Sequence, residues 1–441
     1  MDIDDRLRRL RKEREGRSRA QKIHDTWQNI DRSEELSVKQ KLERLIQLSG
    51  NRKPDAPRRP AGEEISAPGP KDSILYLENA YLLSARYGKI PIALGPDIPG
   101  EILSCLGRDA AFKDTSLSSA VFLDLETTGL AGGTGTVPFL VGLGFYVDGR
   151  FKVAQYFLGD LAEEGRMVRE MGRFFRDMNF GSVITYNGKA FDIPLLETRF
   201  ALNREPFPLD ELPHLDFVFS ARNLWKHKYE SCRLFHLARE IVEAERSEDI
   251  PSAEIPLRYF QYLRTRDFSL VEPILYHNQE DILSLLGVVI AGAVLLDRNR
   301  QSAGETGTDA MDLYGVGRLL EGAGDYEKSV SLFEKALEGN VSREVSLTIR
   351  KKLSSHFKKS RDWSKAVSLW QGMGQTNEVF SYRELAMYYE HKEKNYGEAI
   401  RAAEEGLALS MEVSSPFEKD FVKRLERLRQ KAKKAKDGAQ S

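Results

Sequence analysis

Three short segments hold the residues with which this chain could do chemistry: FLDLETTG at 122–129, YNGKAFD at 186–192 and HNQED at 277–281. Their four carboxylates belong to Asp124, Glu126, Asp192 and Asp281. Carboxylates that gather at one place repel one another unless cations neutralise them, and their hard oxygen atoms suit Mg²⁺ or Mn²⁺. If the fold brings the four together, they can hold two divalent cations against a phosphodiester.

The first pair depends on strand geometry. Asp124 and Glu126 stand two residues apart in a segment expected to be a strand, so both side chains leave the same face. This spacing alone is weak, because many edge strands carry Asp-x-Glu. It gains weight here because the neighbouring residues are apolar, as in a central strand, where buried carboxylates need partners.

The elements that must position these residues extend from about residue 118 to 296. Strands are expected at 121–126, 139–147 and 151–158, and the last two are joined by Asp148-Gly149, a dipeptide typical of a hairpin turn. A helix at 161–178, a strand at 182–188, a helix at 191–203 and a strand at 214–219 follow, and then a helical remainder. This is the element order of an RNase H-like α/β core, a mixed sheet with flanking helices.

The motifs DLETTGL, N-x-x-x-F-D and H-N-x-x-D resemble, in this order, those of the DEDD (DnaQ-like) exonuclease superfamily. The resemblance is closest to its YprB-like RNase H-like domains, which often carry a Gly-rich segment after the first motif, as at 132–136 here. It covers about residues 118–296. It implies a 3′→5′ exonuclease with two divalent cations, whose ligands would be Asp124, Glu126, Asp192 and Asp281.

The third motif departs from both branches of that superfamily. One branch has a Tyr four residues before the last Asp, and the other has a His five residues before it. Here His277 stands four residues before Asp281 and Tyr276 five, so the two side chains are exchanged. On a helix, 277 and 281 share a face. His277 is therefore expected to hold or deprotonate the attacking water, the alternative being a capping or packing role.

Five further residues are candidates for binding the substrate: Thr127, Asn187, Lys189, Lys226 and Arg233. Backbone groups near Thr127 would meet the terminal nucleotide, and Asn187 would bond substrate or orient its own turn. The lysines and Arg233 would contact phosphates. A plain strand end and solvated charges are the corresponding structural alternatives. Phe191 is expected to pack, with base stacking as the alternative.

The flanks divide the rest of the chain. A charged N-terminal segment with a Pro/Gly linker is expected at 1–72, an extension at 73–117 and a linker at 297–310. Helical repeats at 311–412 would form a tetratricopeptide-like solenoid that binds a protein partner, and a basic tail would follow at 413–441. The repeats align Tyr326, Trp363 and Tyr396, spaced by 37 and 33 residues, near the ~34 of a helix-pair repeat.

Composition narrows the class of protein. The net charge of −1 shows no global attraction to nucleic acid, and two cysteines cannot form a disulfide framework. The longest apolar stretch, 285–296, is short for a bilayer span. We therefore expect a cytoplasmic protein that binds no membrane. The expected function is a nuclease acting on single-stranded DNA or RNA, the alternative being a scaffold that binds nucleic acid without cutting it.

Overall fold

The structure, a computed structural model, describes residues 74–129, 135–246, 250–301, 308–374 and 378–437. The expected N-terminal segment at 1–72 and residues 132–134 of the Gly-rich segment lie outside these ranges. The chain forms two compact units, and the first ends at Arg298.

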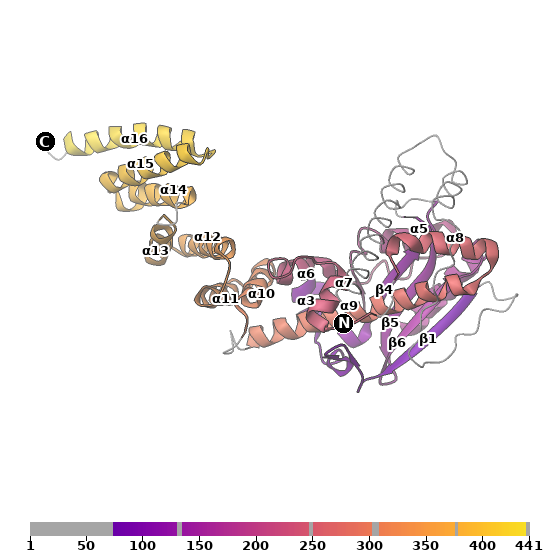
Figure 1. The fold of residues 1–441 in the computed structure, drawn as a ribbon. Helices are drawn as coiled ribbons and strands as arrows, with labels where there is room; N and C mark the ends of the chain where they lie inside the picture. The colour runs from indigo at the N-terminus through magenta and orange to yellow at the C-terminus, as the bar shows by residue number, and fades with distance from the viewer. Residues whose placement is uncertain (1–73, 130–134, 247–249, 302–307, 375–377, 438–441) are drawn as a thin grey trace, which may run out of the picture. The chain divides into compact units, whose positions relative to one another are not determined.

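The first unit is built on a six-stranded sheet in the order β1-β6-β5-β4-β7-β8 (Figure 1). The bounds are β1 Ile74–Leu82, β4 Ala120–Thr127, β5 Pro138–Val147, β6 Arg150–Leu158, β7 Ser182–Thr185 and β8 His214–Asp216. The first four strands of the order pair antiparallel, and β7 and β8 continue parallel to β4. This mixed sheet confirms the α/β class, and it places β4 in the interior of the sheet.

The strand expected at 214–219 is shorter than the sequence indicated. β8 ends at Asp216, whose side chain accepts a hydrogen bond from the backbone of Val218 and caps helix α6, Phe217–Trp225. An aspartate in this N-cap position starts a helix because it satisfies a free backbone N–H group. The apolar run after Asp216 therefore continues as helix.

Residues 74–117 are part of the sheet unit and do not form a separate extension. β1 pairs with β6 along its whole length and forms one edge of the sheet. Helix α3, Gly100–Gly107, packs against β8 and α6 near the other edge. The unit therefore begins at least at Ile74, well before the expected boundary at 118.

Helices cover both faces of the sheet. On one face lie α4 (Glu164–Met178) and α8 (Ile255–Thr265), where Phe145 of β5 meets Phe174 of α4 and Phe139 stacks on Tyr259 of α8. On the other face lies α9, Glu272–Gln301. Side chains alternate between the faces of a strand, so Asp124 and Glu126 of β4 point to the same side as α9.

Helix α9 lies against the sheet at two glycines of β5. A Cβ atom on Gly142 would lie 2.2 Å from Oδ1 of Asn278, and one on Gly144 would lie 2.5 Å from Cγ2 of Ile282. Both contacts are too short for any side chain, so the glycines let the helix approach the strands closely. In the described chain, residues 268–299 are apolar and long enough to cross a membrane, but 72% of the most apolar window is buried.

The second unit is helical. Its helices are α10 Ala310–Gly322, α11 Tyr326–Glu338, α12 Arg343–Ser360, α13 Trp363–Gly374, α14 Val379–Tyr388, α15 Tyr396–Glu412 and α16 Glu418–Asp437. Tyr326, Trp363 and Tyr396 are each the first residue of the second helix in a pair. The preceding Asp or Asn caps that helix through its side chain. The repeated sequence is therefore a helix-start signal.

The expected basic tail at 413–441 contains a packed helix. α16 lies on α15 and buries Phe421, Leu425 and Leu428. These residues recur at helical spacing, so they form a packing face of the helix.

Candidate active site

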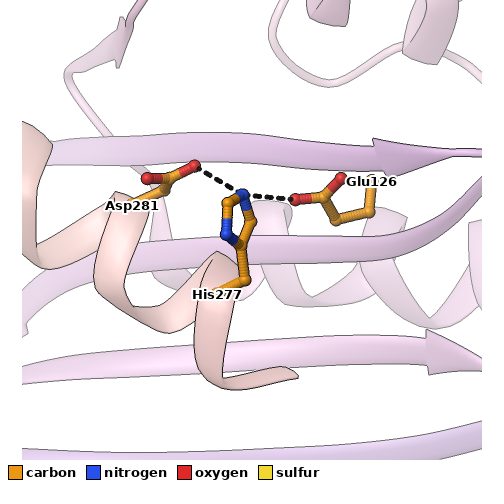
Figure 2. A group of neighbouring side chains, drawn as sticks. All are labelled: Glu126, His277 and Asp281. Carbon is orange, nitrogen blue, oxygen red and sulfur yellow. Dashed lines mark ion pairs between the residues drawn. The ribbon is translucent and has the colours of Figure 1, made fainter. Parts of the chain in front are cut away.

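The end of β4 and the first turns of α9 bring three of the expected residues into one cluster. Figure 2 shows the His277 ring between the carboxylates of Glu126 and Asp281. Its Nε2 atom is 3.6 Å from Oε1 of Glu126 and 3.3 Å from Oδ2 of Asp281. One ligand atom from each residue lies within 4.8 Å of the others. His277 and Asp281 share a helix face because they are four residues apart.

Asp124 is held beside this cluster by α9. Nδ2 of Asn278 donates to Oδ2 of Asp124 at 2.9 Å and lies 3.3 Å from its backbone oxygen. Nε2 of Gln155 in turn donates to Oδ1 of Asn278 at 2.9 Å and to the backbone oxygen of Leu275 at 2.8 Å. Gln155 and Asn278 are both buried, and every side-chain bond named here joins segments far apart in the sequence.

The strand register explains this chain of hydrogen bonds. Asp124 of β4 lies opposite Gly142 of β5, and Gly142 lies opposite Gln155 of β6. The missing side chain at Gly142 leaves the room that the Asn278 amide fills. Gly142 and Asn278 therefore act together to fix the direction of the Asp124 carboxylate. The sequence did not indicate Gly142 or Gln155, and it placed Asn278 in the third motif without assigning it a role.

The second motif places Asp192 at the first residue of α5, Asp192–Leu202. The loop before it is held by Asp216, which accepts hydrogen bonds from the backbone of Asn187 at 2.6 Å and Lys189 at 3.1 Å. Asn187 has a φ of 69°, a left-handed conformation that asparagine tolerates better than most residues. Asp216 is thus a further supporting residue, which the sequence indicated only as part of a strand.

The electrostatics show that the four carboxylates act on one another. Burial raises the pKa of Asp124 well above its usual range, and the charges of Asp281, Glu126 and Asp192 raise it further. Burial, followed by the charge of Asp216, raises the pKa of Asp192 to about 7. A divalent cation among these oxygens would favour the ionised forms. The donor set of carboxylates with one imidazole fits Mg²⁺ or Mn²⁺.

Arg246 is a charged neighbour that the motifs did not indicate. Its buried guanidinium binds Oδ1 of Asp281 and donates to Oγ of Ser284 at 2.8 Å and to the backbone oxygen of Glu280 at 3.1 Å. Asp281 is therefore held from two sides, by Arg246 at Oδ1 and by His277 at Oδ2. Arg246 lies 35 residues from Asp281 in the sequence, outside any local pattern.

The segment at 74–117 positions the third motif. The Tyr81 hydroxyl accepts a hydrogen bond from Nε2 of Gln279 at 2.7 Å. Nδ2 of Asn79 donates to Oε1 of Gln279, also at 2.7 Å. The Tyr87 hydroxyl lies 2.9 Å from Oε2 of Glu280. These contacts fix the face of α9 that points away from the carboxylates. Tyr276 lies on this side as well, because on the helix it is rotated off the face that His277 and Asp281 share, and it interacts electrostatically with Tyr81.

The expected substrate-binding residues lie in three places. The Thr127 hydroxyl donates to the backbone oxygen of Gly129 at 2.6 Å, at the end of β4 next to Glu126. Asn187, Lys226 and Arg233 line one pocket of about 500 Å³. Lys189 is exposed on the loop held by Asp216. The structure thus brings three of the five together.

Phe191 differs from the expected packing role. Its side chain is 57% exposed, although it directly precedes Asp192. A large apolar side chain that remains in solvent beside a partly buried carboxylate can contact a ligand. Base stacking, the alternative considered for this position, is the interpretation that the exposure favours.

Two comparisons relate the chain to known proteins. A sequence profile of the RNase H superfamily matches residues 121–291, which include all four carboxylates. The chain is 30% identical over 333 residues to the uncharacterized protein YprB of Bacillus subtilis (strain 168), a match that covers 74% of this chain and 78% of that protein. The chain belongs to the YprB family. Its first unit contains an RNase H-like domain, and this superfamily supports a nuclease-type function.

Proposed function

We propose that this protein is a metal-dependent nuclease of the DEDD type, a 3′→5′ exonuclease acting on single-stranded DNA or RNA ends. The observation that carries the proposal is the convergence of the three motifs on one face of the sheet. Glu126, His277 and Asp281 lie within 4.8 Å of one another. The charges of Asp281, Glu126 and Asp192 all act on the buried Asp124.

The residues that would hold two divalent cations are Asp124, Glu126, Asp192 and Asp281. Bound there, Mg²⁺ or Mn²⁺ would supply the positive charge that stabilises a phosphodiester during attack by water. The protein's own part is to orient the ligands. Asn278 aligns the Asp124 carboxylate, and Arg246 holds Asp281. These contacts reduce the rearrangement needed when the site is loaded.

His277 is the proposed acceptor of a proton from the attacking water. Its Nε2 atom faces the site between Glu126 and Asp281, and imidazole titrates near neutral pH. The exchange of positions with Tyr276 supports this role, because residue 276 is rotated off the helix face that His277 and Asp281 share.

The test uses end-labelled single-stranded DNA and RNA, incubated with the full-length protein and Mg²⁺ or Mn²⁺, with products resolved by length. We expect products that shorten from the 3′ end, and no cleavage in EDTA. Asp124→Asn and Asp192→Asn should abolish hydrolysis while the protein stays folded, and they also control for contaminating nucleases. Full activity of either variant, or of the natural protein in excess EDTA, would refute the proposal.

The alternative is a scaffold that binds nucleic acid without cutting it. Its expected result in the same assay is retarded migration of the labelled strand with no shortened product. The presence of all four carboxylates favours the enzyme, because repulsion among them has no use in a site that only binds.

The second unit supports a further proposal, a tetratricopeptide-like surface for a protein partner. A pocket of about 570 Å³ is lined by Tyr326 and Phe333 of α11, by Lys351 and Lys359 of α12, and by Phe380 of α14. Tyr326 is 57% exposed there. Aromatic rings with lysines suit a segment that carries apolar and acidic side chains. We propose that the protein acts in the cytoplasm, in keeping with two cysteines that form no disulfide.

A further inference from the structure

A second hollow adjoins the loop of the second motif, which Asp216 holds. The pocket of about 500 Å³ falls in the size range of small-molecule sites. Its walls come from the second motif, from α6 and from the segment that follows α6. Tyr186 and Asn187 line it from the second motif, and Arg222, Lys226, Tyr229 and Arg233 line it from α6 and the segment after it.

The pocket is connected to the catalytic residues through Asp216. The backbone of Asn187, which lines the pocket, donates to Oδ1 of Asp216 at 2.6 Å. Val218, also a lining residue, donates to the same atom at 3.4 Å. The charge of Asp216 also raises the pKa of Asp192. One buried carboxylate thus fixes both the wall of the pocket and the loop that leads to Asp192.

The pocket carries more positive than negative charge. Arg222, Lys226 and Arg233 line it, against the single carboxylate of Glu230. Within the described ranges, neither Lys226 nor Arg233 forms an ion pair, and both are exposed. In a chain with a net charge of −1, this local excess selects an anion. Phosphate is the anion expected beside a nuclease site.

Two aromatic rings accompany the cations. The Tyr186 hydroxyl donates to the backbone oxygen of Cys232, which anchors the ring in the wall of the pocket. Tyr229 is partly exposed and also lines the pocket, and Nζ of Lys228 lies 5.8 Å from the centroid of its ring. Cations with aromatic rings in one concave site match a phosphate that carries an unstacked base. A paired base would be held in its stack and could not enter.

We propose that this pocket binds one unpaired nucleotide of the substrate strand, next to the nucleotide held at the four carboxylates. Lys226 and Arg233 contact its phosphate, and Tyr229 stacks on its base. The inference rests on the proposed nuclease function and adds the reason for a single-stranded substrate. It also assigns Lys226 and Arg233 to one subsite, whereas Lys189 lies on the exposed loop outside the lining residues.

The test measures binding of short fluorescent oligo(dT) and oligo(U) to the full-length protein in EDTA, so that nothing is cut. Lys226→Ala combined with Arg233→Ala should weaken binding about tenfold or more. The slope of log affinity against log salt should fall by about 0.7 for each phosphate that the variant no longer neutralises. Tyr229→Ala should weaken binding about tenfold, whereas Tyr229→Phe keeps the ring and should bind like the natural protein.

The matched control is Lys113→Ala combined with Arg173→Ala, two exposed cations outside the pocket. It removes the same charge and should leave affinity and salt slope unchanged. The nucleotide subsite is refuted if the control variant weakens binding as much as the pocket variant does. It is also refuted if a blunt duplex binds as tightly as a single strand. If the strands are cut and bound normally by the pocket variants, the subsite is wrong and the nuclease stands. If nothing is cut by the natural protein with Mg²⁺ or Mn²⁺, the nuclease is wrong.

Discussion

At the residue scale, the site combines carboxylates that repel one another with groups that hold them in place. Asp281 is bound by Arg246 and by His277, and Asp124 is bound by Asn278. These partners lie on α9 or contact it, so the helix is the element that fixes the geometry. A cation that enters must coordinate the same oxygens, and its affinity will depend on these partners.

His277 can be separated from its neighbour by substitution. His277→Ala should lower kcat by about 10²–10⁴-fold, the usual contribution of a general base, while the affinity for an uncut strand in EDTA changes little. Tyr276→Phe should be nearly silent, because Tyr276 lies toward Tyr81. Steady-state kinetics on one oligonucleotide measures both variants. A large loss in Tyr276→Phe with none in His277→Ala would assign the working position to Tyr276.

Gly142 and Asn278 should behave as a coupled pair. Gly142→Ala places a methyl group where the Asn278 amide lies, so it should displace Asn278 and with it Asp124. Asn278→Ala should destabilise the fold by about 1–3 kcal/mol, since Gln155 and Asp124 lose buried hydrogen bonds. In the double variant the added methyl group has room, and the two losses should be far from additive.

Denaturant unfolding and kcat are measured for the natural protein, for each single variant and for the double variant. Leu143→Ala is not a suitable control, because Leu143 is a core residue of the same strand. Gly149→Ala serves better: it lies in the hairpin after β5 with no atom near a Cβ, although its φ of 67° predicts a small loss of stability. Additive losses for Gly142→Ala and Asn278→Ala would show that the glycine does not act through the amide.

At the element scale, local patterns in the sequence predicted most of the sheet. β4, β5, β6, α4 and β7 follow from apolar runs, helical spacing and the Asp148-Gly149 turn, all of which are local signals. β1 gave a weaker signal, because only its first residue is buried, the rest alternate between partly buried and exposed, and its partner β6 is distant in the sequence.

The sequence likewise predicted part of the site. The carboxylates follow from motifs, whereas their supports do not, since Gln155 and Asn278 lie 123 residues apart and Asp281 and Arg246 lie 35 residues apart. Such pairs are made by the fold, and nothing in either local sequence marks the partner. The N-cap role of Asp216 was readable in principle, because an aspartate before an apolar run is a common helix start.

The docking of α16 depends on one buried carboxylate. Glu390 has no exposed side-chain surface and pairs with Arg424 at 3.0 Å, Arg427 at 2.8 Å and Lys431 at 2.8 Å. Burial alone would raise the pKa of Glu390, but hydrogen bonds from Arg427 and Lys431 outweigh it and lower the pKa to about 2. The stabilisation is therefore complete above the usual glutamate pKa and is lost as the pH falls from about 4.5 to 2.

Glu390→Gln should lower the stability of the second unit by about 2–3 kcal/mol at pH 7, because three cations lose their charged acceptor. Thermal unfolding of the full chain between pH 7 and 3 measures the effect, and the difference from the natural protein should shrink toward acid pH. Glu404→Gln is the control, since its pair with Arg429 at 3.0 Å is exposed on both sides. A loss in the control equal to that in Glu390→Gln would show that the buried cluster contributes nothing special.

At the scale of the whole molecule, the chain joins two compact units with separate cores. All four carboxylates, His277, Arg246 and the nucleotide pocket belong to the first unit, and the lysine-lined pocket of α11 and α12 belongs to the second. We therefore expect the proposed cleavage and the proposed partner binding to be separable by substitution or truncation. The outcome would distinguish an enzyme with an attached recruitment module from an enzyme that needs both units for catalysis.

A chain truncated after Gln301 keeps the whole of α9 and should retain cleavage with little change in kcat. An end at 296 would instead remove the last turn of α9, including the buried Asn299, and is a poorer choice. Circular dichroism and the nuclease assay measure folding and activity of the truncated chain. Loss of catalysis in a chain that still folds would show that the helical unit is part of the active enzyme.

For partner binding, Lys351→Glu combined with Lys359→Glu in the full chain should abolish capture of the partner as completely as truncation does, while cleavage by this variant stays at the natural rate.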